Sequence, residues 1–67
     1  MTITFKDGSK ITASKDVLNE LSTIYDSAAR DTGLKGYYAI EKSYHDKAMH
    51  IYNELERVGF YDSVREI

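Results

Sequence analysis

Apolar side chains recur in steps of three and four between residues 37 and 58. They are Tyr37, Ile40, Tyr44, Ala48, Ile51, Leu55 and Val58. This spacing places seven side chains on one face of an α-helix of about 22 residues. Gly36 and Gly59 bracket the stretch, and neither Gly nor Pro interrupts it. The pattern predicts one continuous helix over 37–58, with the rest of the chain covering its apolar face.

A second apolar stripe follows Ser14. It consists of Val17, Leu18, Leu21, Ile24, Tyr25 and Ala28, with Asn19, Thr23, Asp26 and Arg30 on the opposite side. Ser14 is a typical N-cap residue, and Asp16 in the first turn suits the helix dipole. We expect Gly33 to end this helix in a left-handed conformation. The connection 32–36 then has a length typical of antiparallel helix pairs.

The first thirteen residues alternate apolar and polar side chains around Asp7-Gly8. A two-residue loop would pair Thr4 with Ile11 and place Ile3 on the other face from Ile11. A three-residue loop, with Gly8 left-handed in a G1 bulge, pairs Phe5 with Ser9, Ile3 with Ile11 and Met1 with Ala13. The apolar side chains then share one face: Met1, Ile3, Phe5, Ile11 and Ala13. We therefore predict the second register, with this face on the helices because an isolated hairpin is only marginally stable.

The segment after Gly59 leaves two interpretations open. Phe60, Val64 and Ile67 have helical spacing, and Ser63 with Glu66 resembles a capping box. A third strand over 63–67 is the alternative, and we favour a short helical turn against the core. The predicted fold class is α+β, a ββαα domain over residues 1–67. In it a two-stranded antiparallel hairpin packs on an antiparallel two-helix hairpin.

Composition narrows the function classes. Nine Lys and Arg against eleven Asp and Glu give a net charge of −2, which argues against direct nucleic-acid binding. Cysteine is absent, so disulfides and thiolate metal sites are excluded, and a reducing compartment fits. No apolar run approaches the ~20 residues that span a bilayer, and no signal-peptide pattern opens the chain. We expect a soluble, cytoplasmic protein with no membrane association.

The candidate binding site is a shoulder of the long helix, formed by Tyr38, His45, Met49 and Tyr52. These residues lie roughly 80–140° away from the apolar stripe around the helix. A helix needs an apolar stripe only about 100° wide to pack, so the shoulder is surplus to packing. One interpretation is a partner or dimer surface with tyrosine anchors and an adaptable methionine. The other is that the hairpin or the C-terminal tail covers it within the monomer.

Asp46, His50 and Glu54 lie one turn apart on the other flank of the same helix. A His and a Glu four residues apart can reach one divalent ion, and Asp46 could join them. Only Asp16, Glu20 or Asp31 of the preceding helix could complete such a site. We favour a solvated face with helix side-chain pairs and predict neither a metal nor a cofactor.

Acidic side chains along both predicted helices could imitate duplex phosphates. They are Asp16, Glu20, Asp26, Asp31, Glu41, Asp46, Glu54 and Glu56. The interspersed Lys42, Lys47 and Arg57 dilute that field, so an ordinary charged surface is the favoured interpretation. Ser, His and Asp occur without the spacing of a nucleophile elbow, a metal-hydrolase helix or a phosphate loop. The sequence therefore predicts no enzyme activity.

The chain resembles small accessory proteins of phages and prophages of Gram-positive bacteria. Type II anti-CRISPR inhibitors of the CRISPR effector nuclease belong to that group. The likeness lies in a DGSK hairpin and the stretch GYYAIEKSYHDKAMHIYNELERVGFYD, without Cys or Pro. It implies a stoichiometric inhibitor that binds a host or defence protein in the host cytoplasm, and it carries over no functional residue. The near-neutral charge departs from that of the strongly acidic members, which argues against a DNA-mimic form of such an inhibitor.

The sequence as a whole predicts a non-enzymatic protein-binding module of this inhibitor kind. It would act through the Tyr38, His45, Met49 and Tyr52 shoulder, alone or after homodimerising through it. The alternatives are a small DNA-binding transcriptional regulator or antitoxin, and a metal-stabilised domain.

Overall fold

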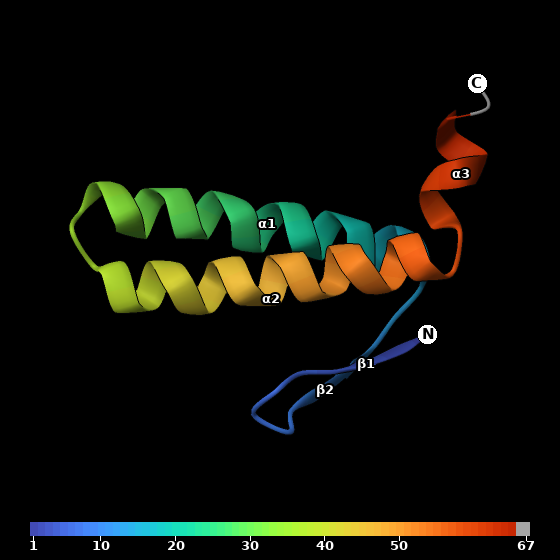
Figure 1. Cartoon of the computed structure of the whole chain (residues 1–67), viewed down its shortest axis with the longest axis horizontal. Helices are drawn as coiled ribbons and strands as arrows, with labels where there is room; N and C mark the ends of the chain where they lie inside the picture. Colours follow the sequence, from blue (N-terminus) through green and yellow to red (C-terminus); the bar gives the residue numbers. More distant parts are fainter. Residues whose placement is uncertain (66–67) are drawn as a thin grey trace.

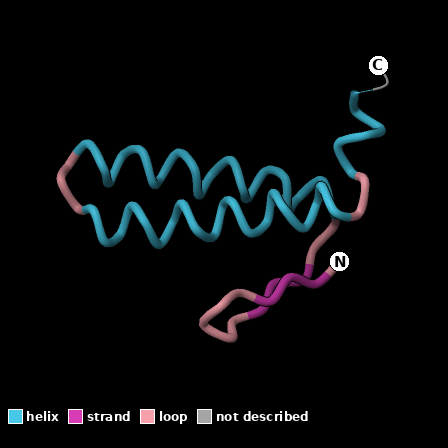
Figure 2. Tube along the Cα trace, in the orientation of Figure 1, coloured by secondary structure: helices cyan, strands magenta, loops and turns pink. Residues whose placement is uncertain are grey.

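Two long antiparallel helices lie side by side and form the body of the molecule (Figure 1). The computed structural model describes residues 1–65. Its elements in chain order are β1 (Thr2–Thr4), β2 (Lys10–Thr12), α1 (Lys15–Leu34), α2 (Tyr38–Arg57) and α3 (Phe60–Arg65). This order confirms the predicted α+β architecture, a ββαα chain that ends in a short helix (Figure 2).

The hairpin has the predicted register. The paired residues are Thr2 with Thr12, Ile3 with Ile11, and Thr4 with Lys10. The Phe5 N–H donates to the carbonyl of Ser9 (2.9 Å) and closes a three-residue loop. Within that loop Gly8 has a φ of 89°, which a residue with a Cβ rarely adopts. Alternation then points Ile3 at the helices, where it is buried, and leaves the threonines exposed.

The segment after Gly59 is helical. α3 begins at Phe60 and includes residues 63–65, so a third strand starting at residue 63 is wrong for the described chain. The predicted capping partner Glu66 and the apolar Ile67 lie outside the described residues.

The start of α1 is where the sequence predicts it. The Ser14 hydroxyl accepts a hydrogen bond from the Val17 N–H (3.2 Å), which makes Ser14 the N-cap. Asp16 stands in the first turn, where the helix dipole favours a negative charge. A cap of this kind stabilises a helix by about 1 kcal/mol.

The predicted end of α1 at Gly33 is wrong. The helix continues through Leu34, and the left-handed residue is Gly36, with a φ of 84°. A Cβ at Gly33 would meet only the carboxylate end of the flexible Glu41 side chain on α2, which can move aside. A short connection over 35–37 joins the two helices.

The core lies at one end of the helix pair. Its fully buried side chains are Ile3, Leu18, Ile51 and Leu55. Partly buried side chains packed against them are Met1, Phe5, Ile11, Ala13, Leu21, Tyr25, Phe60 and Tyr61. These residues come from the hairpin, both long helices and α3, so all the elements meet at this end.

The predicted apolar stripe of α2 is buried only in its second half. Ala48, Ile51 and Leu55 are buried, Tyr44 is half-buried, and Tyr37, Ile40 and Val58 are exposed. Val17 and Ile24 of the α1 stripe are exposed as well. The prediction that all seven α2 positions are covered is therefore wrong. For Ile24, Tyr37 and Ile40 the reason is length, because a three-residue strand extends about 10 Å whereas a 20-residue helix extends about 30 Å. Length does not account for Val17 and Val58, which are exposed at the core end.

The hairpin and α3 contact opposite sides of α2. The Lys47 amino group lies 5.6 Å from the centre of the Phe5 ring in the hairpin. The Tyr52 ring stacks on Tyr61 of α3. Lys47 and Tyr52 are about 140° apart around the helix. At the core end, the hairpin and α3 therefore pack on different sides of the helix pair.

The other end of the helix pair, residues 28–44, we call the free end. Figure 1 shows the hairpin turn stopping short of the connection between the helices, and α3 pointing away from this end. Leu34 is 90% exposed here, and both Tyr37 and Tyr38 are exposed. None of the helices within residues 1–65 has the length and apolar character that crossing a bilayer requires.

Candidate functional site

The predicted shoulder follows one side of α2. Because residues 38–57 form one continuous helix, its four members extend along that side for about 21 Å. Tyr38 is 70% exposed, Met49 43% and Tyr52 38%, and His45 is exposed between them. The shoulder therefore runs from the free end to the core end of the molecule.

The C-terminal helix covers part of Tyr52. The rings of Tyr52 and Tyr61 stack with centroids 4.8 Å apart and planes at 28°. The Tyr61 hydroxyl in turn donates to the Asn19 side-chain oxygen (2.8 Å), which fastens α3 to α1. Tyr52 thus supports the fold at this end, and truncating it would loosen α3. Tyr38, His45 and Met49 remain as the exposed part of the shoulder.

Burial raises the pKa of the Tyr61 phenol above its ordinary value of 10.0, and the neighbouring Tyr52 adds to the shift. The neutral phenol is the form that donates to Asn19, so folding favours the protonated state. Below pH 10 the phenol is neutral in both the folded and the unfolded chain, and its contribution to stability is complete. As pH rises through the raised pKa, that contribution is lost.

We therefore expect the melting temperature to fall more steeply above pH 10 in the native chain than in Tyr61→Phe. The variant keeps the ring stack but has no phenolic proton to release. Thermal unfolding followed by circular dichroism between about pH 8 and pH 11 measures this difference. Parallel curves for the two proteins would show that Tyr61 does not contribute to the alkaline loss.

A hollow of about 390 Å³ lies beside the shoulder between α1 and α2. It is lined by Asp26, Ala29, Arg30, Glu41, Lys42 and His45. His45 also borders a second hollow, of about 360 Å³, between α2 and the turn of the hairpin. The middle of the shoulder is therefore a ridge between two concave surfaces, which gives a partner both a protrusion and a recess to engage.

The ion pair in the first hollow contributes little to stability. Arg30 pairs with Asp26 at 3.0 Å, and both side chains are largely exposed. Exposed pairs of this kind contribute only about 0–1 kcal/mol, because water screens them. The paired groups can therefore exchange partners at little energetic cost when another protein approaches.

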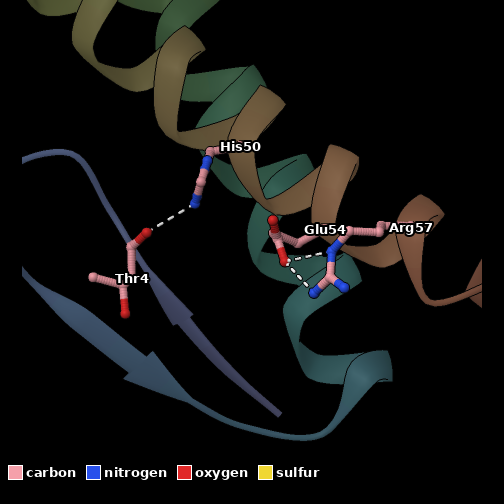
Figure 3. A network of polar contacts seen from close by, with 4 residues as sticks. All are labelled: Thr4, His50, Glu54 and Arg57. Carbon is pink, nitrogen blue, oxygen red and sulfur yellow. Dashed lines mark hydrogen bonds and ion pairs between the residues drawn. The ribbon is translucent and has the colours of Figure 1, made fainter.

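His50 anchors the hairpin to α2 (Figure 3). Its Nε2 lies 2.8 Å from the Thr4 carbonyl oxygen. A carbonyl can only accept, so Nε2 carries the proton and donates. The imidazole also lies 5.7 Å from the Phe5 ring, centre to centre. His50 therefore satisfies a carbonyl on the outer edge of β1 that would otherwise face water or another strand.

Replacing His50 by Ala is expected to lower the free energy of unfolding by about 1–2 kcal/mol, the sum of one hydrogen bond and part of a ring contact. His45→Ala is the matched control, since His45 lies on the same helix and is exposed. Its effect should stay within about 0.5 kcal/mol. Urea unfolding measures the free energy of unfolding of both variants. Equal decreases in this free energy would contradict the anchoring role of His50.

Two of the three candidate metal ligands Asp46, His50 and Glu54 have other partners, namely His50 and Glu54. The Glu54 carboxylate accepts two hydrogen bonds from Arg57, the shorter at 2.8 Å, and this interaction lowers the pKa of Glu54 (Figure 3). The His50 Nε2 is directed at Thr4. Nowhere in the described part of the chain do three His, Asp or Glu side chains gather as a metal site requires.

Comparison with protein-family models, with curated proteins and with solved structures found none that matches the chain. The function must therefore be argued from the surface itself.

Sequence reasoning missed two features of this surface. One is the anchoring role of His50, whose partner Thr4 is 46 positions away along the chain. No local pattern signals a contact across that separation. The other is the stack of Tyr52 on Tyr61, although the tail was considered as a cover for the shoulder. The surface that results offers aromatic and methionine side chains beside weakly paired charges.

Proposed function

We propose that this chain is a non-enzymatic protein-binding module that docks a partner on the exposed part of the shoulder. The observation that carries the proposal is the placement of Tyr38 and Met49. Both are large, apolar and substantially exposed, and both lie on one side of α2. His45 lies between them at the rim of the hollow.

Side chains of this kind contribute most of the energy of protein interfaces. A tyrosine brings a rigid ring with one hydrogen-bonding group, and a methionine adapts its shape to a partner. Complete burial of such a side chain contributes roughly 1.5–3 kcal/mol. Burial of Tyr38 and Met49 together would thus supply a hot spot at the centre of an interface.

The hollow indicates the chemistry of the partner. It presents both signs of charge, with Arg30 and Lys42 beside Asp26 and Glu41. A complementary segment would carry an apolar residue for the shoulder and flanking charges of both signs for the hollow. A helical segment fits best, since two helices that lie side by side form a groove that can accept a third helix.

The resemblance to phage accessory proteins narrows the proposal further. It makes the partner a host or defence nuclease, of the CRISPR effector kind, and the chain its stoichiometric inhibitor. In that setting the shoulder would occupy a surface that the nuclease needs for DNA or for its own movement. The support for this narrower form is the sequence resemblance alone.

A double variant tests the proposal. We expect Tyr38→Ala with Met49→Ala to weaken partner binding by roughly 30-fold or more, which corresponds to about 2 kcal/mol. The melting temperature should change little, because both side chains are exposed. Lys10→Ala, on the outer face of the hairpin, is the matched control and should bind as the native chain does.

The first measurement is titration of the chain into a purified, guide-loaded type II CRISPR effector nuclease. DNA cleavage and co-elution are followed together. If the native chain inhibits the nuclease and the double variant does not, both the shoulder docking and the nuclease as partner are supported. Inhibition that the double variant retains contradicts the shoulder as the docking site.

If the native chain does not bind the nuclease, the narrower proposal is wrong. The broader proposal is then tested with a partner that is captured from the native host, identified and purified. The affinities of the native chain and of the double variant for this partner are compared. Equal affinity of the native chain and the double variant for that purified partner would contradict it.

A further inference from the structure

The turn of the hairpin contains the dipeptide Asp7-Gly8, and the sequence has no other Asp-Gly and no Asn-Gly. Both residues are exposed, and the turn lies at the tip of the hairpin (Figure 1). Gly8 has a φ of 89°, and the space that a Cβ would occupy there is open. No side chain of residue 8 therefore shields the Gly8 nitrogen from the carboxyl group of Asp7.

This dipeptide can rearrange its own backbone. When the Gly8 nitrogen attacks Cγ of Asp7, a C–N bond forms and closes a succinimide ring. The amide proton and the carboxyl hydroxyl leave together as water. Water then opens the ring: attack at Cγ restores aspartate, and attack at the backbone carbonyl carbon gives isoaspartate. The sequence of steps needs water and no other reactant.

The folded turn engages both reacting groups. Oδ1 of Asp7 accepts hydrogen bonds from the Ser9 N–H (2.9 Å) and from the Ser9 hydroxyl (2.6 Å). The Gly8 N–H donates to the carbonyl oxygen of Phe5 (3.0 Å). Ring closure removes the Gly8 proton and so breaks the bond to Phe5. It also turns the carboxylate into a neutral carbonyl, which accepts hydrogen bonds from Ser9 more weakly.

The protonation state of Asp7 opposes ring closure as well. A carboxyl group loses its oxygen as water only from the uncharged acid, because the carboxylate has no hydroxyl to release. The bond from the Ser9 hydroxyl, followed by the bond from the Ser9 N–H, lowers the pKa of Asp7. Near neutral pH the uncharged acid is therefore rarer in the turn than in an unfolded chain.

We propose that Asp7 is a site of spontaneous isomerisation to isoaspartate, and that its hydrogen bonds with Ser9 keep the reaction slow in the folded chain. Ser9 is itself exposed, so its side chain serves the turn rather than the core. Removing the Ser9 hydroxyl should take away one of the two bonds on Oδ1 and leave the packing of the domain unchanged.

Isoaspartate at this position would damage the hairpin. It inserts a methylene group into the backbone of a loop that the Phe5 N–H closes on the Ser9 carbonyl (2.9 Å). The Phe5 ring packs on the core and lies 5.7 Å from that of His50, centre to centre. A lengthened loop would therefore disturb the contact between the hairpin and α2.

The rate of isoaspartate formation tests the proposal. The native chain and Ser9→Ala are incubated near neutral pH, in buffer and in guanidinium chloride, and isoaspartyl methyltransferase labels the product. In buffer Ser9→Ala should react at least about threefold faster than the native chain, the effect expected for one lost hydrogen bond. In guanidinium chloride the turn is absent, so the two rates should be equal and should exceed the native rate in buffer.

Two further variants serve as controls. Thr2→Ala removes an exposed hydroxyl bond (2.8 Å) from the same hairpin outside the turn, and it should react as slowly in buffer as the native chain. Asp7→Glu identifies the site, because its longer side chain does not close the five-membered ring, and most of the label should be lost. Circular dichroism checks that each variant is folded in buffer.

Equal rates for the native chain in buffer and in guanidinium chloride would overturn the proposal, and this comparison needs no variant. An equal acceleration of Ser9→Ala in both solvents would also overturn it, because the effect would then lie in the sequence and not in the turn. The same holds for Thr2→Ala reacting as fast as Ser9→Ala, or for Asp7→Glu keeping the label. All these measurements use the chain alone, so their outcome is independent of the proposed docking function.

Discussion

Ile51→Ala should lower the free energy of unfolding by about 3 kcal/mol, whereas Ile40→Ala should lower it by less than about 1 kcal/mol. Both residues belong to the same predicted apolar stripe of α2. Ile51 is fully buried against Ile3, Leu18 and Leu55, while Ile40 is 47% exposed. A loss of 3 kcal/mol is a large part of the stability of a small domain.

Urea unfolding followed by far-UV circular dichroism compares the two variants. The protein concentration should be about 1 µM, so that self-association does not add to the measured stability. Similar losses for Ile51→Ala and Ile40→Ala would mean that the free end is covered within the monomer, and would contradict the fold as described.

Ile3→Ala should have an effect of similar size and should release the hairpin from the helices. Ile3 is 1% exposed and connects the hairpin to the buried residues of both long helices. Its removal leaves a cavity where those elements meet, with a cost of about 2–4 kcal/mol. Thr2→Ala is the control, since Thr2 lies on the outer face and its hydroxyl bonds the exposed Thr12 hydroxyl (2.8 Å).

Amide hydrogen exchange locates the effect of Ile3→Ala. The Phe5 and Ala13 amides donate across the hairpin and should exchange at least about tenfold faster in the variant. Thr2→Ala should leave their exchange nearly unchanged. Unchanged protection of these amides in a destabilised Ile3→Ala would show that the hairpin folds independently of the helices.

The sequence predicts the hairpin and the helices well because their signals are local. Alternation around Gly8 distinguishes two registers, since only one of them places Ile3 and Ile11 on the same face. The serine at position 14 marks the start of α1 through a contact three residues away. Short-range rules suffice for features of this kind.

The extent of the core could not be predicted in the same way. The stripe of α2 is periodic from Tyr37 to Val58, but burial depends on what lies above each position in three dimensions. The hairpin is too short to reach Ile40, and periodicity carries no information about that distance. Gly33 misled the prediction because a glycine often ends a helix in a left-handed conformation, whereas here that conformation occurs at Gly36.

The candidate site was partly predictable. The helical wheel alone places Tyr38, His45 and Met49 on one side of α2. The role of Tyr52 depends on where α3 returns, and the role of His50 depends on where β1 lies. Both contacts join segments that no local pattern relates. Ile24 and Ile40 were expected in the core, although both are exposed, for the same reason.

The central claim is that the helix pair is closed at one end by the hairpin and α3 and open at the other. Hydroxyl-radical footprinting of the dilute chain, read by mass spectrometry, tests it most directly by comparing tyrosines within one molecule. The account predicts that Tyr38 is oxidised several times faster than Tyr61, whose hydroxyl and ring both have partners. Equal protection of Tyr38 and Tyr61 in the monomer would contradict it.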